Sequence, residues 1–157
     1  MATFASLVGI KLKDNKGEDS YDLSPLIFGS KRNESLREAT VHHSINGDFT
    51  LRKDEWKLLF SPGSGGWSYP KPEEVGKINP PLPDIQLYNM ENDPAEKTNL
   101  YDKHPDIVKE LTSLMASCIL NGRSTPGTPQ KNTGGPTGKE KEIIRMSKME
   151  VPRHVGQ

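Results

Sequence analysis

Residues 39–61 read ATVHHSINGDFTLRKDEWKLLFS, and this stretch determines the fold that we expect. It contains three short runs of β-branched, aromatic and other apolar residues, which predict strands at Ala39–Ile45, Phe49–Lys53 and Trp56–Ser61. Asn46-Gly47 separates the first two runs, and Asp54-Glu55 separates the last two. Because Asn-Gly tolerates the positive φ of a tight hairpin turn, the stretch predicts an antiparallel meander.

A fourth strand is predicted at Ile85–Asn89, after a long loop rich in Gly and Pro. The clearest helical pattern follows at Pro105–Asn121, where apolar side chains recur on one face. Pro105 suits the first helical turn, and Gly122 suits a left-handed C-terminal cap. We therefore expect an α+β fold in which a small four-stranded antiparallel sheet packs against one long helix.

The remaining residues predict little regular structure. Only 32% of the 157 residues are hydrophobic, with 14 Gly and 13 Pro, so a modest core and long irregular segments are expected. We expect an irregular connector at residues 1–36, the compact subdomain at 37–121 and a flexible, disordered tail at 122–157. Residues 139–149 in this tail carry a helical pattern, but such a short helix is marginal by itself in water.

Charge and hydropathy exclude several classes of partner. The sequence has 21 basic and 21 acidic residues, so it offers no basic surface for nucleic acid or an anionic membrane. Its apolar runs are too short to span a bilayer. The N-terminus MATFASLVGIKLKD has no basic leader and no cleavage pattern, so no signal peptide is expected.

The sequence contains no complete catalytic or metal-binding motif, so we assign no catalytic residue and no metal ligand. Cys118 is the single cysteine, which excludes an internal disulfide and a cysteine-based zinc site. Its helical spacing favours a small buried apolar residue over a reactive thiol.

His42 and His43 are the most noticeable polar residues in the predicted strands. Neighbouring strand residues point to opposite faces, so the two rings do not chelate one metal ion. If Asn46-Gly47 is a two-residue turn, His42 shares a face with Phe49, and His43 shares the other face with Thr50. One interpretation is a histidine hydrogen-bonded at a packed interface, and the other is a substrate-binding histidine at the rim of a pocket.

Trp67 lies in the middle of the long loop between the third and fourth strands. It is a candidate for stacking on a substrate ring, or it anchors the loop to the core. The apolar character of the indole favours the anchor.

Four stretches resemble segments of one protein family, and they follow one another along the chain in the same order as in that family. Leu87–Leu111, LYNMENDPAEKTNLYDKHPDIVKEL, resembles the C-terminal signature of sulfatases, in which a strand, an Asn-Asp-Pro turn and a helix follow one another. Residues 41–72 are similar to the hairpin and loop before this signature in bacterial arylsulfatases. Residues 2–29 resemble the end of their catalytic domain, and NGRSTPGTPQKN at 121–132 resembles the end of these proteins. Residues 133–157 depart from the pattern.

The resemblance implies the C-terminal portion of a bacterial arylsulfatase, whose chemistry lies in a larger α/β domain. The whole enzymes use calcium and a formylglycine made from the first residue of a Cys/Ser-x-Pro-x-Arg motif. Cys118 is followed by Ile-Leu-Asn-Gly, and the stretch from Ser124 to Thr128 lacks the arginine. We therefore expect no cofactor in this chain.

The expected function is that of a C-terminal fragment of an arylsulfatase-type sulfuric ester hydrolase, inactive alone. Its role would be structural, with substrate contacts from His42, His43 and Trp67. The resemblance implies a sulfatase catalytic domain as partner, a sulfate ester as substrate, and a periplasmic or secreted whole enzyme. The alternative is a stand-alone glycan- or protein-binding module derived from a sulfatase.

Overall fold

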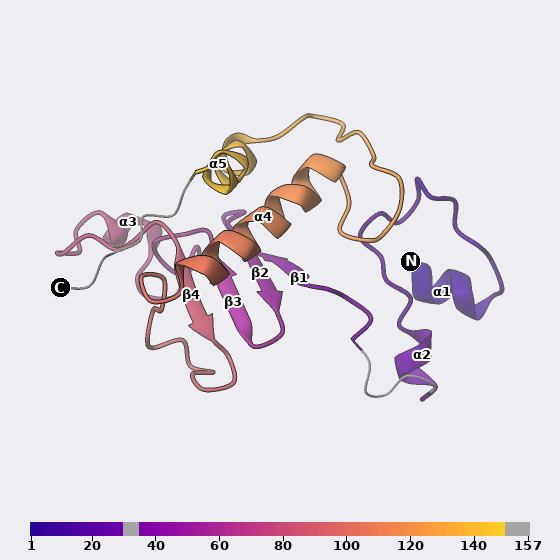
Figure 1. Ribbon diagram of the computed structural model, residues 1–157, viewed down its shortest axis with the longest axis horizontal. Helices are drawn as coiled ribbons and strands as arrows, with labels where there is room; N and C mark the ends of the chain where they lie inside the picture. The colour runs from indigo at the N-terminus through magenta and orange to yellow at the C-terminus, as the bar shows by residue number, and fades with distance from the viewer. Residues whose placement is uncertain (30–34, 150–157) are drawn as a thin grey trace. The chain divides into compact units, whose positions relative to one another are not determined.

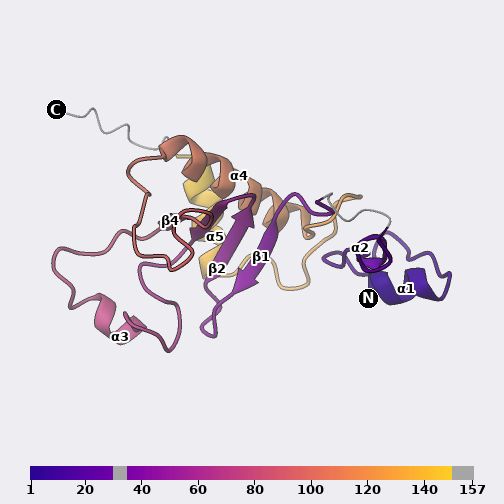
Figure 2. The same cartoon turned by 90° about the horizontal axis from the view of Figure 1, so that it is seen from below.

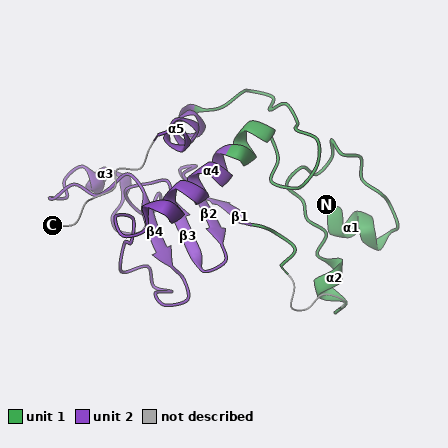
Figure 3. Ribbon diagram, viewed as in Figure 1, with its two compact units in different colours: residues 1–38, 117–137 green, residues 39–116, 138–157 purple. Residues whose placement is uncertain are grey.

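The computed structural model describes residues 1–29 and 35–149 (Figure 1). The contact pattern divides the chain into two compact units, residues 1–38 with 117–137 and residues 39–116 with 138–157 (Figure 3). The expected division at residues 36 and 121 concerns the domains of a whole protein and stays a prediction. The elements, in chain order, are α1 Ala2–Leu7, α2 Ser24–Ile27, β1 Thr40–His43, β2 Phe49–Lys53, β3 Trp56–Leu59, α3 Pro72–Val75, β4 Gln86–Asn89, α4 Pro105–Asn121 and α5 Gly138–Ser147.

The second unit contains the predicted four-stranded antiparallel sheet, with strand order β1-β2-β3-β4. Leu51, Leu58 and Leu87 lie opposite one another across β2, β3 and β4, and all three are 0% exposed. Burying three aligned leucines on one face contributes several kcal/mol, roughly 1.5–3 kcal/mol for each side chain. This row is the centre of the core.

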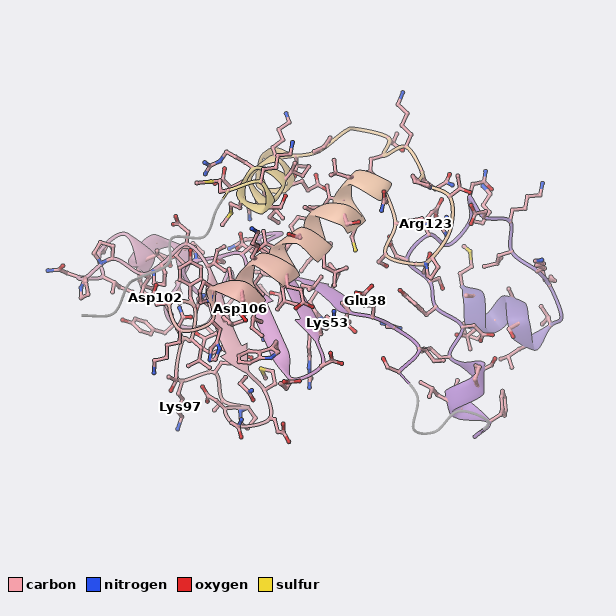
Figure 4. All side chains as sticks on the ribbon, viewed as in Figure 1. Glu38, Lys53, Lys97, Asp102, Asp106 and Arg123 are labelled. Carbon is pink, nitrogen blue, oxygen red and sulfur yellow. The ribbon has the colours of Figure 1, made fainter. Side chains whose placement is uncertain are left out.

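Helix α4 covers the leucine face of the sheet. It crosses the strands in both views, and its residues up to Ala116 belong to the second unit (Figures 1 and 2). Val108, Leu111 and Met115 recur at helical spacing and are each 2% exposed. On the second strand, Lys53 pairs with Glu110 of α4, with 2.7 Å between Nζ and Oε1 (Figure 4). The predicted α+β fold, a small sheet against one long helix, is confirmed.

The predicted register of the first hairpin is wrong by one residue. His43 pairs with Phe49, Val41 with Leu51, and His42 with Thr50. A two-residue type I′ turn needs positive φ at both Asn46 and Gly47, but of these two only Gly47 has it, at 75°. The chain instead makes a three-residue loop, in which Gly47 N–H donates to the Ser44 carbonyl and Ser44 N–H to the Asp48 carbonyl.

This one-residue difference from the predicted register reverses the face to which each side chain of β1 points, because side chains alternate along a strand. His43 now shares the α4 side with Phe49 and Leu51, and His42 shares the opposite side with Thr50. The second turn is as predicted, since Lys53 pairs with Trp56 across Asp54-Glu55.

The outer edge of β4 is covered by the segment that precedes α4. Asn99 Oδ1 accepts the Leu87 N–H at 3.0 Å, and Asn99 Nδ2 donates to the Ile85 carbonyl at 3.4 Å. Leu100 N–H then donates to the Leu87 carbonyl at 2.8 Å. An amide side chain and one backbone group therefore replace a fifth strand here.

The first unit is built from α1, α2 and the segment that follows α4. The C-terminus of α4 has the predicted left-handed cap: Gly122 has φ of 61°, its N–H donates to Ile119, and the Arg123 N–H donates to Cys118. Among the helices that the structure describes, none is long and apolar enough to cross a membrane.

Candidate functional site

The face of the sheet turned away from α4 carries a hollow of about 750 Å³. All four strands contribute to it, since side chains that alternate with the buried leucines point to this side. The loop after β3 and the loop after β4 complete the walls. The strand residues that line the hollow are His42, His43, Thr50, Arg52, Lys57, Leu59, Gln86 and Tyr88.

The lining of this hollow is polar and charged. Lys57 forms an ion pair with Glu96 at 2.5 Å, and the Tyr88 hydroxyl donates to Gln86 Oε1 at 2.7 Å. Burial raises the pKa of Tyr88, and the negative charges of Glu96 and Asp93 raise it further. Tyr88 is therefore a neutral phenol that holds the Gln86 side chain in place at neutral pH.

The two histidines lie at the end of the hollow nearest the first hairpin. His42 is on the open face, beside Thr50, and its side chain is exposed. His43 reaches the rim of the hollow, but its ring meets the ring of Phe49 on the α4 side, edge to face, with centroids 4.6 Å apart. The rings diverge, as strand geometry requires.

Trp67 does not anchor its loop to the core, so that interpretation is wrong. Its side chain is 83% exposed, and Tyr69 two residues later is 75% exposed. The loop is held by its polar groups instead: Ser64 N–H donates to the Pro70 carbonyl at 3.1 Å, and Ser64 Oγ donates to the Ser68 carbonyl at 2.7 Å. Tyr69 lines the hollow, whereas Trp67 projects from the same loop without lining it.

Gln86 is a site residue that sequence reasoning missed. Its Nε2 donates to the carbonyls of Ser61 and Gly63, at 2.6 and 2.9 Å, and so holds against β4 the start of the aromatic loop, residues 61–70, which carries Trp67 and Tyr69. A polar residue directly before the buried Leu87 was the available signal, because alternation places it on the open face.

The first unit contains a second polar centre, around Arg123 (Figure 4). The guanidinium pairs with Asp14 at 3.0 Å and donates to the carbonyls of Asp14, Thr125, Pro126 and Thr128. Its side chain is 7% exposed. An arginine whose donors are all used inside the protein ties the chain together and leaves little of its charge for a ligand.

The thiol of Cys118 also bears on chemistry. Burial raises the pKa of Cys118, with the charges of Asp19 and Glu38 acting in the same direction. A thiol with a raised pKa stays protonated and is a poor nucleophile. Within residues 1–29 and 35–149, no three His, Cys, Asp or Glu side chains are grouped to hold a metal ion.

The arrangement was compared with known proteins. No protein-family model matches the chain. Over 116 residues, which is 74% of its length, the chain is 28% identical to the N-acetylgalactosamine-6-O-sulfatase of Bacteroides thetaiotaomicron. The chain is homologous to the sulfatases.

Structural similarity supports this sulfatase homology. A solved structure from work on the metabolism of multiple glycosaminoglycans by the same bacterium aligns with 74% of the chain, at a TM-score of 0.57 and 27% identity. The sheet and long helix match the sulfatase C-terminal region. The chain covers only 22% of the length of that curated relative and 23% of the length of the solved chain. The narrower identification as an arylsulfatase stays a prediction, because the relative is an N-acetylgalactosamine-6-O-sulfatase.

Proposed function

We propose that this chain is the C-terminal region of a sulfuric ester hydrolase and forms one wall of its substrate site. The observation that carries the proposal is the polar hollow on the open sheet face, with His42 at one end and the Trp67 loop beside it. The cation of Arg52 and the hydroxyls of Thr50 and Tyr88 suit an anionic, hydroxyl-rich ligand. The exposed indole of Trp67 suits the face of a sugar ring. The chain would then position substrate and carry out no bond cleavage itself.

The residues of this chain do not fit the formylglycine and metal that sulfatases generally use. The 157-residue sequence contains no Cys/Ser-x-Pro-x-Arg motif. The part of the chain that the structure describes groups no three potential metal ligands. No catalytic step is therefore assigned to this chain, and its proposed partner is a sulfatase catalytic domain.

The first unit offers apolar surface for that partner. α1 and α2 contact each other, and the large apolar side chains on and beside them are exposed. Such clusters mark surfaces that pack against protein. The most exposed members are Phe4, Phe28, Val8, Met1 and Ile27, at 75%, 70%, 69%, 68% and 62%.

The substrate-contact proposal is tested by NMR titration of the full chain with N-acetylgalactosamine 6-sulfate. We expect the His42 ring and Trp67 indole resonances to shift, and unsulfated N-acetylgalactosamine to shift them less. His42→Ala and Trp67→Ala should weaken binding. His104→Ala is the matched control, because the His104 ring lies 4.9 Å from that of Trp56, outside the hollow. Unmoved His42 and Trp67 resonances would contradict the proposal.

The assignment of chemistry to another domain has a separate test. The purified chain should not hydrolyse an aryl sulfate, because it supplies no activated nucleophile. Turnover by this chain would contradict the proposal. If the hollow is one wall of a larger site, the chain alone should bind the glycan only weakly. Tight binding by the chain alone, without turnover, would favour the stand-alone glycan-binding module, which the 83% exposure of Trp67 also suits.

A further inference from the structure

Helix α5 belongs to the part of the sequence that departs from the sulfatase pattern, yet it packs within the second unit, beside the sheet. Ile143 is its one buried residue, at 2% exposure. A hollow of about 380 Å³ lies between α5 and the sheet, lined by Phe49 and Ile85 on one side and Met146 on the other. A ten-residue helix is marginal alone, so its structure depends on such contacts.

The N-terminus of α5 is tied to the loop of the first hairpin. Lys139 Nζ lies 2.6 Å from Asp48 Oδ1 and donates to the Asn46 carbonyl at 2.7 Å. The Asp48 side chain is 18% exposed, so this pair is partly shielded from water. Lys139 therefore binds Asn46 within the three-residue loop and Asp48 directly after it.

The same hairpin loop supports the aromatic loop. Gly65 has φ of 66°, and a Cβ at this position would lie 2.7 Å from Asp48 Oδ2 and 2.9 Å from Ser44 Oγ. Ser44 Oγ in turn accepts the Asp48 N–H at 3.0 Å. The backbone at Gly65, two residues before Trp67, thus lies against Ser44 and against Asp48, which Lys139 holds.

These contacts form one continuous series from α5 to the exposed aromatic residues. Lys139 fixes Asp48, Asp48 and Ser44 support Gly65, and the hydrogen bonds of Ser64 shape the turn that presents Trp67 and Tyr69. On the far side, Gln86 holds the start of this loop. The hydrogen bonds of Gln86 join β4 to the loop and do not involve α5, whereas the contact through Lys139 depends on whether α5 is docked.

We propose that Lys139 is a positioning residue, through which the docked α5 helix sets the conformation of the Trp67 loop. The inference rests on the proposed function, in which this loop contacts substrate. Release of α5 would loosen the hairpin loop and then the aromatic loop, while the sheet stays intact. The C-terminal helix would thereby regulate the substrate-facing surface.

The test is hydrogen exchange of the full chain without ligand, followed by mass spectrometry of peptides covering residues 61–70. Lys139→Met should speed exchange in this segment roughly two- to fivefold, as expected for loss of one partly exposed ion pair. Lys139→Arg keeps the charge and should restore protection. Lys141→Met is the matched control, since Lys141 is an exposed lysine of the same helix.

Exchange at Leu58 and Leu87 separates positioning from general stability. The proposal holds if Lys139→Met accelerates residues 61–70 while these core amides keep their wild-type rates. It is overturned if the loop keeps its wild-type rate, or if loop and core accelerate by the same factor. Because no ligand is present, either result is independent of whether the hollow binds a sulfated sugar.

Discussion

Arg123 shows most clearly how one side chain organises a segment with little regular structure. All three guanidinium nitrogens donate hydrogen bonds, and three of the four backbone carbonyls that accept them belong to residues after α4. Gly127 is required beside it, because a Cβ there would lie 2.4 Å from the guanidinium carbon. The flexible tail from residue 122 stays a prediction. It was based on polar composition, which gives no weight to a buried arginine that binds carbonyls.

Arg123→Met should destabilise this segment locally. It leaves several carbonyls without their donor and Asp14 without its ion-pair partner, which costs about 1–3 kcal/mol. Native-state hydrogen exchange at Thr128 measures the loss, because the Thr128 N–H donates to Asp14 Oδ2 at 2.8 Å. Arg145→Met is the control and should change stability by less than about 0.5 kcal/mol, since Arg145 is 61% exposed. Equal effects would refute the structural role of Arg123.

Asp14 should titrate below its ordinary value of 3.8. The hydrogen bonds from Thr128 are the largest cause of the lowered pKa, and Arg123 acts in the same direction. A lowered folded-state pKa contributes stability that is full above pH 3.8 and is lost as the pH falls through the folded value. NMR titration of the Asp14 carboxyl measures this pKa, and Thr128→Val should raise it. An Asp14 pKa unchanged by that substitution would contradict the assignment.

At the scale of elements, the four strands and α4 were predictable because each has a periodic apolar pattern and a recognisable boundary. The register of the first hairpin was not predictable from its Asn-Gly pair. That pair also suits a three-residue loop with Gly47 left-handed, and the Ser44 side chain favours this loop by accepting the N–H groups of Asn46 and Asp48. The one-residue difference decides which histidine faces the hollow.

Asn99, five residues after Pro94 in the Leu87–Leu111 stretch that carried the family resemblance, has a structural role at β4. Asn99→Ala should lower the free energy of unfolding by about 1–3 kcal/mol, because it leaves the N–H groups of Leu87 and Tyr101 without their acceptor. Asn99→Asp keeps the acceptor oxygen and should cost less. Urea denaturation followed by circular dichroism measures both. The prediction fails if the aspartate variant is as unstable as the alanine variant.

At the scale of the molecule, the composition predicted a small core. Sequence motifs predicted the similarity to sulfatases, but they did not predict the full set of residues that line the hollow. His42 and Trp67 were candidates because of their residue types. Gln86 was missed although its position directly before the buried Leu87 places it on the open face. Lys139 and Gly65 were missed because their roles depend on contacts between segments distant in the chain, and no local pattern encodes such contacts. The hollow itself is a property of the sheet face and two loops together.

The exposed apolar residues of the first unit should make the isolated chain bind a hydrophobic dye. Phe4→Ser combined with Phe28→Ser should reduce the dye fluorescence at least about twofold if this surface is the binding site. Ile45→Ser is the control, because Ile45 is 66% exposed but lies in the hairpin loop of the second unit. Equal reductions would show that the dye does not report on the α1 and α2 surface.

The side-chain amide of Asn99 has a consequence for self-association. A sheet that presents two open edges can polymerise without limit, because each added copy offers a new edge. Here the β4 edge is already hydrogen-bonded by Asn99 and Leu100, and β1 is the other edge strand. Two copies joined through their β1 strands would then present only capped edges. Fibre growth through this sheet would therefore stop at a dimer.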